Sequence, residues 1–243
     1  MQEDHPARTA RRQAGEPSGE GHALASLGAA TRQLGRSAEA AEYNEQALAV
    51  YRRAGDRSGQ ARALNNLGLA EIELGRSALA LEHLEQACAG FAAEGEQRGE
   101  ASALDSLGDA YHRLGRHGRA ADCFARSIEA FRRIGCQDRA WPLSRLGELA
   151  LDEGRPAAAL ASFTEVLGLA DETGSPLIAA QAHSGVGRAH HALGNRLLAR
   201  EHCTRALRIF RELEVRDTRQ LGKLRAVLDS RAARDNPSPA APR

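Results

Sequence analysis

A pair of glycines recurs along this chain about every 40 residues, and this internal repeat limits the fold more than any other feature. The first glycine follows a leucine or valine, and it stands at Gly28, Gly68, Gly108, Gly147 and Gly187, so successive repeats are offset by 40, 40, 39 and 40 residues. The second glycine comes seven residues later, at Gly35, Gly75, Gly115, Gly154 and Gly194. The sequence therefore predicts five similar structural repeats in tandem.

Each repeat has the pattern of two helices joined by a tight turn. In the second repeat, residues 62–74 place apolar side chains at helical spacing, Gly75 ends that helix, and residues 78–91 carry a second apolar stripe. A glycine within a helix costs about 1 kcal/mol relative to alanine, so we expect Gly68 where two helices approach too closely for a Cβ. The second glycine is expected to adopt the left-handed conformation that ends a helix. Four more glycines mark the turns between repeats, at Gly55, Gly95, Gly135 and Gly174.

Other positions of the repeat are small or apolar. When the first glycine is numbered position 8, position 20 is alanine in all five repeats and position 4 is leucine in four of them. This combination resembles the tetratricopeptide repeat over residues 21–215, and its longer unit is similar to the arrays of large bacterial transcriptional regulators and kinesin light chains. The resemblance implies an all-α, right-handed superhelical solenoid of five helical hairpins plus a C-terminal capping helix.

The ends of the chain differ in composition from the array. Residues 1–20 are charged and lack an apolar stripe, so we expect them to be disordered. The five repeats are expected near 21–60, 61–100, 101–139, 140–179 and 180–215. Leu221, Leu224 and Leu228 share one helical face, which predicts a capping helix over 216–232 that covers the last repeat. The proline-rich residues 233–243 are expected to be disordered.

The fourth repeat is irregular. It has the 39-residue offset and contains the only tryptophan, Trp141, which is followed by Pro142. The proline predicts a first helix that begins late, near Trp141, after a longer turn over residues 135–139. Two interpretations remain open: a tolerated deletion that changes the helical stacking locally, or a partner-contacting irregularity in which Trp141 is an exposed anchor.

The sequence contains no motif for catalysis or cofactor binding. It has no GxxxxGK[ST], GxSxG or HExxH pattern, and Gly185 and Gly187 fall within a helix rather than after a strand. His183, His190 and Cys203 take facing positions of the fifth repeat, where a soft metal site is conceivable. Side chains that simply fill a terminal repeat explain them better. We therefore expect no catalytic residue, no cofactor and no metal site.

The resemblance also implies a binding groove, because the first helix of each hairpin lines the concave face of such arrays. Among its positions 2, 5, 6, 9, 12 and 13 in the second to fifth repeats, the candidate contacts are Arg62, Asn65, Asn66, Asp105, Asp109, His112, Ser144, Arg145, Glu148, Arg188 and His191. Asparagine both donates and accepts hydrogen bonds, which suits an extended peptide, and Arg145 and Arg188 suit carboxylates. The alternative is an ordinary solvated helix face. The pattern of the carboxylate clamp found in chaperone-binding members is not met.

Charge and cysteine content bear on partners and location. The formal net charge is +1, but residues 186–243 carry +7 and the preceding residues −6, so a basic end follows an acidic body. Direct nucleic-acid binding is not expected, because aromatic residues for stacking are scarce. The chain has no apolar run long enough for a membrane span, a polar N-terminus and four widely spaced cysteines. We expect a cytoplasmic protein.

Two functions fit these features. We expect a non-catalytic scaffold or adaptor that binds a protein or peptide partner in its concave groove. The alternative is a regulatory protein that senses an effector, related to the C-terminal arrays of bacterial transcriptional regulators and dependent on a separate DNA-binding partner.

Overall fold

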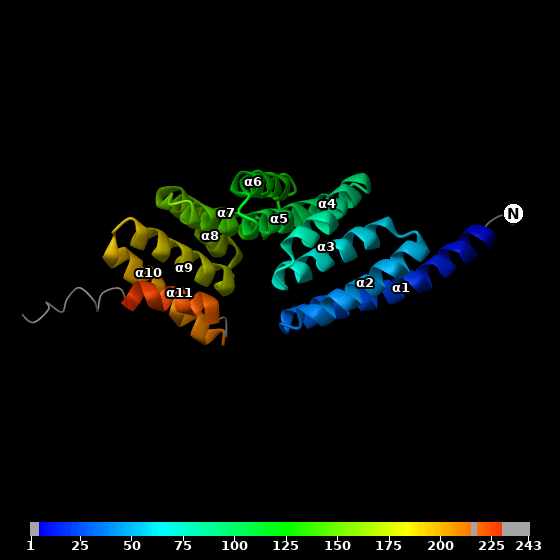
Figure 1. The fold of residues 1–243 in the computed structure, drawn as a ribbon, viewed down its shortest axis with the longest axis horizontal. Coiled ribbons are helices and arrows are strands. Elements are labelled where there is room, and N and C mark those ends of the chain that lie inside the picture. The colour runs from blue at the N-terminus through cyan, green and yellow to red at the C-terminus, as the bar shows by residue number, and fades with distance from the viewer. Residues whose placement is uncertain (1–4, 215–217, 230–243) are drawn as a thin grey trace, which may run out of the picture. The chain divides into compact units, whose positions relative to one another are not determined.

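The computed structural model describes residues 5–214 and 218–229, and within these ranges the chain forms α-helices and one 3-10 turn, with no strand (Figure 1). Consecutive helices pack as hairpins: α1 (His5–Gln33) with α2 (Ser37–Ala54), α3 (Arg57–Glu73) with α4 (Ser77–Ala93), α5 (Gln97–Arg113) with α6 (His117–Arg133), α7 (Ala140–Asp152) with α8 (Pro156–Thr173), and α9 (Pro176–Ala192) with α10 (Arg196–Glu212). Helix α11 (Thr218–Asp229) follows. The predicted all-α array of five hairpins and a capping helix is confirmed.

The chain separates into two compact halves, an N-terminal half (Met1–Cys136) and a C-terminal half (Gln137–Arg243). Within each half the first helices of successive hairpins contact one another. Helix α3 contacts α1 and α5 in the N-terminal half, and α9 contacts α7 and α11 in the C-terminal half. The surface that these helices build is called the first-helix face of each half below.

The turn glycines adopt the conformation that their spacing predicts. Nine of them have φ between +62° and +80°: Gly35, Gly55, Gly75, Gly95, Gly115, Gly135, Gly154, Gly174 and Gly194. Residues with a Cβ enter this region only at a cost. Glu214, 40 residues after Gly174, is the one non-glycine residue with positive φ in the described ranges, at 53°. The last turn thus keeps the backbone shape of the others without their glycine.

The first glycine of each repeat lies where the two helices of a hairpin cross. An added Cβ on Gly108 would lie 2.5 Å from Cε1 of Phe124, and one on Gly187 would lie 2.6 Å from Sγ of Cys203. Real Cβ atoms do not approach other atoms this closely. The glycine lowers the intrinsic helix propensity of the first helix. It also leaves room for the side chain of the second helix to pack directly against the backbone of the first.

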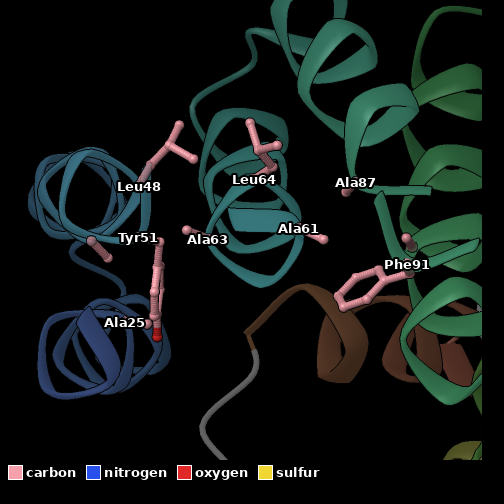
Figure 2. Packing of buried hydrophobic residues seen from close by; sticks show 10 residues of the cluster. Ala25, Leu48, Tyr51, Ala61, Ala63, Leu64, Ala87 and Phe91 are labelled. Atoms are coloured by element: carbon pink, nitrogen blue, oxygen red, sulfur yellow. The ribbon is translucent and has the colours of Figure 1, made fainter. Parts of the chain in front are cut away.

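The core of the N-terminal half consists of alanines around a few large side chains (Figure 2). The ring of Tyr51 on α2 is fully buried and lies against Gly59 of α3. Phe91 on α4 repeats this arrangement one hairpin later, against Gly99 of α5. Each ring therefore joins its own hairpin to the next one, which is the interface that stabilises a linear repeat array.

The N-terminus differs from the sequence prediction. Disorder was expected over residues 1–20, whereas α1 continues back to His5. Gly21 lies against the neighbouring helix, where an added Cβ would lie 2.7 Å from Tyr51, whereas an added Cβ on Gly19 would have nothing within 4 Å. Extending an existing helix by further turns requires no new nucleation, so residues 5–20 can be helical without an apolar stripe of their own. Residues 1–4, 215–217 and 230–243, including the tail predicted over 233–243, lie outside the described residues.

The fourth repeat begins as its proline predicts. A 3-10 turn covers Gln137–Arg139, and α7 starts at Ala140 and is 13 residues long, shorter than the 17 residues of α3, α5 and α9. Pro142 is buried in the first turn of α7, where its missing N–H has no helical acceptor to lose.

Among the described residues, no helix combines the length and apolar character that crossing a membrane requires.

Candidate functional site

The predicted polar residues of the N-terminal half lie on its first-helix face. Arg62 is exposed, and Asn65 and Asn66 of α3 are half-buried, as is Asp105 of α5. Asn65 and Asp105 occupy the same repeat position on two helices that contact each other. The Oδ1 atom of Asn65 is shielded from solvent and accepts no hydrogen bond within the described part of the chain. The protein thus leaves an acceptor unsatisfied on this face.

Asp109 and His112 are less available than the sequence suggests. The carboxylate of Asp109 is almost fully buried and accepts a hydrogen bond from Nε of Arg113, at 3.3 Å, one helical turn later. The ring of His112 lies edge-on to that of His117 at the start of α6, with 5.6 Å between centroids. These two side chains therefore also have structural contacts within their own repeat.

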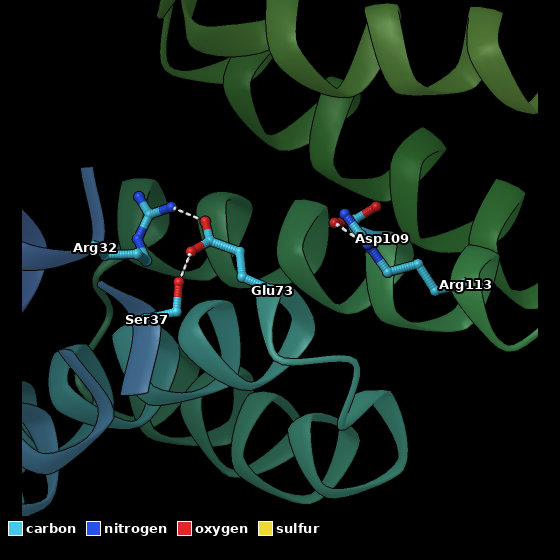
Figure 3. A network of polar contacts seen from close by, with 5 residues as sticks. All are labelled: Arg32, Ser37, Glu73, Asp109 and Arg113. Carbon is cyan, nitrogen blue, oxygen red and sulfur yellow. Dashed lines mark hydrogen bonds and ion pairs between the residues drawn. The ribbon is translucent and has the colours of Figure 1, made fainter. Parts of the chain in front are cut away.

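A second polar cluster ties the first helices together near their C-terminal ends (Figure 3). The carboxylate of Glu73, the last residue of α3, accepts a hydrogen bond of 2.6 Å from Arg32 of α1 and one of 2.5 Å from the hydroxyl of Ser37 on α2. Arg32 and Glu73 occupy positions 12 and 13 of their repeats, but sequence reasoning missed the cluster because its three members lie on three different helices. It fixes the first hairpin to the second.

The first-helix face of the C-terminal half is organised by one carboxylate. Glu148 of α7 accepts hydrogen bonds from the guanidinium of Arg188 on α9 and from Nζ of Lys223 on α11, the latter at 3.2 Å. The three residues all follow the glycine of a Leu-Gly or Val-Gly pair, so they form a row across α7, α9 and α11. Burial alone raises the pKa of Glu148, but the two cations outweigh it and hold that pKa below its ordinary value. Arg188 is thus engaged within the protein.

Replacing Glu148 by glutamine should destabilise the C-terminal half by about 1–3 kcal/mol, because Arg188 and Lys223 then face each other without a counter-charge. Since the folded-state pKa is lowered, the carboxylate stabilises fully above its ordinary pKa and progressively less as pH falls through the lowered value. Urea unfolding between pH 3 and 7 checks this. The free energy of unfolding of the variant should fall less steeply toward low pH than that of the unmodified chain. Glu153→Gln is the control, because Glu153 pairs with Arg155 in the adjoining exposed turn and not with Arg188 or Lys223. Equal effects of both substitutions would contradict the assignment.

The other predicted residues of the C-terminal half are spread over α7 and α9. Trp141 is 42% exposed at the start of α7, as an anchor would have to be. The hydroxyl of Ser144 donates to the carbonyl of Ala140 in its own helix, at 2.8 Å. Arg145 is half-buried, and His191 is exposed near the end of α9. The structure thus keeps Trp141, Arg145 and His191 accessible.

The histidines of the fifth repeat pack against each other. Nδ1 of His183 on α9 lies 2.9 Å from Nδ1 of His202 on α10, and the ring of His190 is 5.9 Å from that of His202. Burial, followed by the neighbouring imidazole, lowers the pKa of His183. Cys203 points instead toward Gly187, and burial raises its pKa to about 11, which disfavours the thiolate that a metal requires. Within the described ranges, no group of three or more His, Cys, Asp or Glu side chains has the arrangement of a metal site.

Helix α11 carries part of the pattern of a first helix. Leu221, Gly222 and Lys223 match the Leu-Gly pattern and the following charged position, 35 residues after Gly187. Unlike the first glycines of the five hairpins, Gly222 has nothing within 4 Å of an added Cβ, because α11 is not followed by a second helix in the described part of the chain. This offset is shorter than the 39 or 40 residues that separate the five hairpins, so the match falls outside their period.

Comparisons with known proteins agree with this architecture. Models of the tetratricopeptide repeat match residues 19–93, 99–172 and 144–213. Among solved structures, a putative kinesin light chain with nearly identical TPR-like repeats from Podosopora anserina is 19% identical, with a TM-score of 0.64 over 82% of this chain and 97% of that one. Aspartyl phosphate phosphatase F from Bacillus subtilis is 12% identical, with a TM-score of 0.74 over 90% of this chain and 57% of that one.

A third structure is a signal transduction ATPase with numerous domains and a tetratricopeptide repeat sensor, from Pyrococcus horikoshii. It is 17% identical, with a TM-score of 0.72 over 91% of this chain and 34% of that one. No curated protein sequence matches the chain. At these identities the solved structures establish the fold alone, whereas the repeat models cover more than half of the residues. The chain belongs to the tetratricopeptide repeat family.

Proposed function

We propose that this protein is a non-catalytic interaction module that binds an extended segment of a protein partner on the first-helix face of its N-terminal half. The observation that carries the proposal is the row of exposed and half-buried polar side chains on α3 and α5, in which Oδ1 of Asn65 is shielded and accepts no hydrogen bond within the described part of the chain. An unsatisfied buried acceptor costs about 1–3 kcal/mol. Rotation of this half-buried amide toward a bound peptide would let a backbone N–H recover part of that cost.

The polar residues favour a particular ligand chemistry. Asn65 and Asn66 both donate and accept, so they match the alternating N–H and C=O groups of an extended backbone without selecting its sequence. Asp105 adds negative charge on the neighbouring helix, which favours a segment that carries a basic side chain. We further propose a cytoplasmic location, because all four cysteines are free thiols in the structure.

A peptide library selected on the full chain tests this function. The binding of a selected peptide should weaken about 10- to 100-fold in Asn65→Ala/Asn66→Ala, because two amide pairs at about 1 kcal/mol each or more are lost. Titration calorimetry measures the affinity, and far-ultraviolet circular dichroism verifies the helical content.

The matched control is Gln86→Ala, which removes an exposed amide from α4, outside the first-helix face. The binding of the same peptide should be unchanged in this variant. If the asparagine variant binds as the unmodified chain does, or if Gln86→Ala weakens binding equally, the N-terminal first-helix face is not the site.

The printed description of one structural neighbour supports a second candidate. The Pyrococcus horikoshii protein uses its tetratricopeptide repeats as a sensor attached to an ATPase. The present chain would then be an effector-sensing regulator that acts through a separate DNA-binding or ATPase protein. Affinity capture from native extract distinguishes the two: a DNA-binding or ATPase partner favours the regulator, and a client enzyme favours the scaffold.

A further inference from the structure

An apolar stripe on α1 is not covered by any other described part of the chain. Ala23, Leu27 and Ala30 recur along one side of the helix, and Leu34 follows its last turn on the same side. All four are exposed, Leu27 to 50% and Leu34 to 75%. Exposed leucines are common singly, but a row of apolar side chains on one helix side marks an interaction surface.

The equivalent positions in the second repeat are covered by a neighbouring helix. Ala63, Leu67 and Ala70 of α3 occupy the same repeat positions as the stripe on α1, and each is at most 2% exposed. Leu67 and Ala70 cluster with Ala40 and Ala41 of α2, and Ala63 belongs to the cluster that contains Ala47 and Leu48 of α2. In the array this face therefore packs against an antiparallel helix that offers small side chains beside larger ones. On α1 that helix is missing from the described residues.

We propose that a second copy of the chain supplies the helix that covers the stripe on α1, so that two α1 helices pair antiparallel about a two-fold axis. In this pairing Ala23 of each copy faces Leu34 of the other, and Leu27 faces Ala30. Both pairings have the same midpoint along the helix, between Gly28 and Ala29, so one axis satisfies both. Every leucine then meets an alanine, which is the large-to-small complementarity that packs well. A two-fold interface requires such self-complementarity.

The charges at the two ends of the stripe favour the same arrangement. Glu20 and Arg36 are both exposed, and they lie at opposite ends of the stripe at nearly equal distances along the chain from its midpoint. Antiparallel pairing brings Glu20 of one copy toward Arg36 of the other, whereas parallel pairing places like charges together. Because a single helix pair buries a small area, the dimer should be weak, with a dissociation constant on the order of micromolar.

Sedimentation velocity of the full chain from about 1 to about 100 μM tests the association. The unmodified chain should shift from monomer to dimer over this range, and Leu27→Glu/Leu34→Glu should remain monomeric, a loss of affinity of at least about 10-fold. Leu197→Glu is the control, because Leu197 on α10 is 87% exposed and lies outside the stripe; this variant should dimerise normally. An unmodified chain that stays monomeric, or a stripe variant that still dimerises, overturns the proposal.

Crosslinking tests the antiparallel register. A mixture of Ala23→Cys and Leu34→Cys chains should form a disulfide-linked dimer on mild oxidation. Ala23→Cys alone should not do so beyond the level of the unmodified chain, because its two copies would be about 17 Å apart along the helix pair. Efficient self-crosslinking of Ala23→Cys would indicate a parallel pairing and overturn the two-fold model. Substitutions at Asn65 and Asn66 should leave the association unchanged, so this test is independent of peptide binding.

Discussion

Replacing Gly187 by alanine is expected to destabilise the protein by about 2 kcal/mol, whereas the same replacement at Gly222 is expected to stabilise it by up to about 1 kcal/mol. Both glycines lie inside a helix and follow an apolar residue. An added Cβ at Gly187 would lie 2.6 Å from Sγ of the buried Cys203 and 3.1 Å from the carbonyl oxygen of Ala199. The second contact is with backbone, so α9 and α10 would have to separate.

At Gly222 the same methyl group meets nothing within 4 Å, so only the gain in helix propensity remains. The pair of substitutions thus separates helix propensity, which is equal in both, from the close approach of two helices, which occurs in one. In thermal unfolding followed by circular dichroism, the Tm of the Gly187 variant should be about 4–8 °C lower than that of the unmodified chain. The Tm of the Gly222 variant should be unchanged or slightly higher. Two shifts of the same sign would contradict the close-contact explanation.

Replacing Phe163 by alanine should cost about 3–5 kcal/mol. The ring is 2% exposed on α8 and packs against glycines on two helices, Gly147 of α7 and Gly185 of α9. Its removal leaves a cavity at the junction of the fourth and fifth repeats, because the ring lies against two glycines that have no side chain to fill the space. Urea unfolding of the full chain measures the loss.

A double-mutant cycle sharpens this prediction. An added Cβ on Gly185 would lie 2.3 Å from Cδ1 of Phe163, so Gly185→Ala alone should destabilise the protein. In the background of Phe163→Ala the ring is absent, and Gly185→Ala should become neutral or stabilising because it gains helix propensity. The two substitutions should therefore couple by about 2–3 kcal/mol. Additive effects would mean that the ring and the glycine do not contact each other as the structure shows.

Most of the fold could be predicted because glycine has few alternatives where a Cβ is excluded. The spacing of Gly68 and Gly75 gave both the crossing point of a hairpin and the turn that closes it, and the positive φ values confirm the turn. The late start of α7 followed in the same way from Pro142. At the turn glycine and at Pro142 the backbone conformation depends on one residue and its immediate neighbours, so the sequence alone is sufficient. The contact at Gly68 is with Leu84 of the other helix, and it could be predicted because the same glycine recurs in every repeat.

The polar side chains were harder to predict, because the partner of a charged group lies on another helix. Arg188 was expected to bind a ligand carboxylate, but it donates to the carboxylate of Glu148 instead. Lys223 donates to the same carboxylate from α11, a helix that does not follow the 40-residue spacing. The first part of helix α1 was missed for a different reason. No apolar pattern marks residues 5–20, because that segment extends an existing helix.

The division of the chain into two halves gives each of them its own optical signal. The single tryptophan, Trp141, lies in the C-terminal half, and the three tyrosines, Tyr43, Tyr51 and Tyr111, all lie in the N-terminal half. Selective tryptophan emission therefore follows the unfolding of residues 137–243, and tyrosine absorbance is governed by residues 1–136. Substitutions at Phe163 and Gly187 should shift the emission transition directly, so the response of each half to a distant substitution can be measured without attaching a dye.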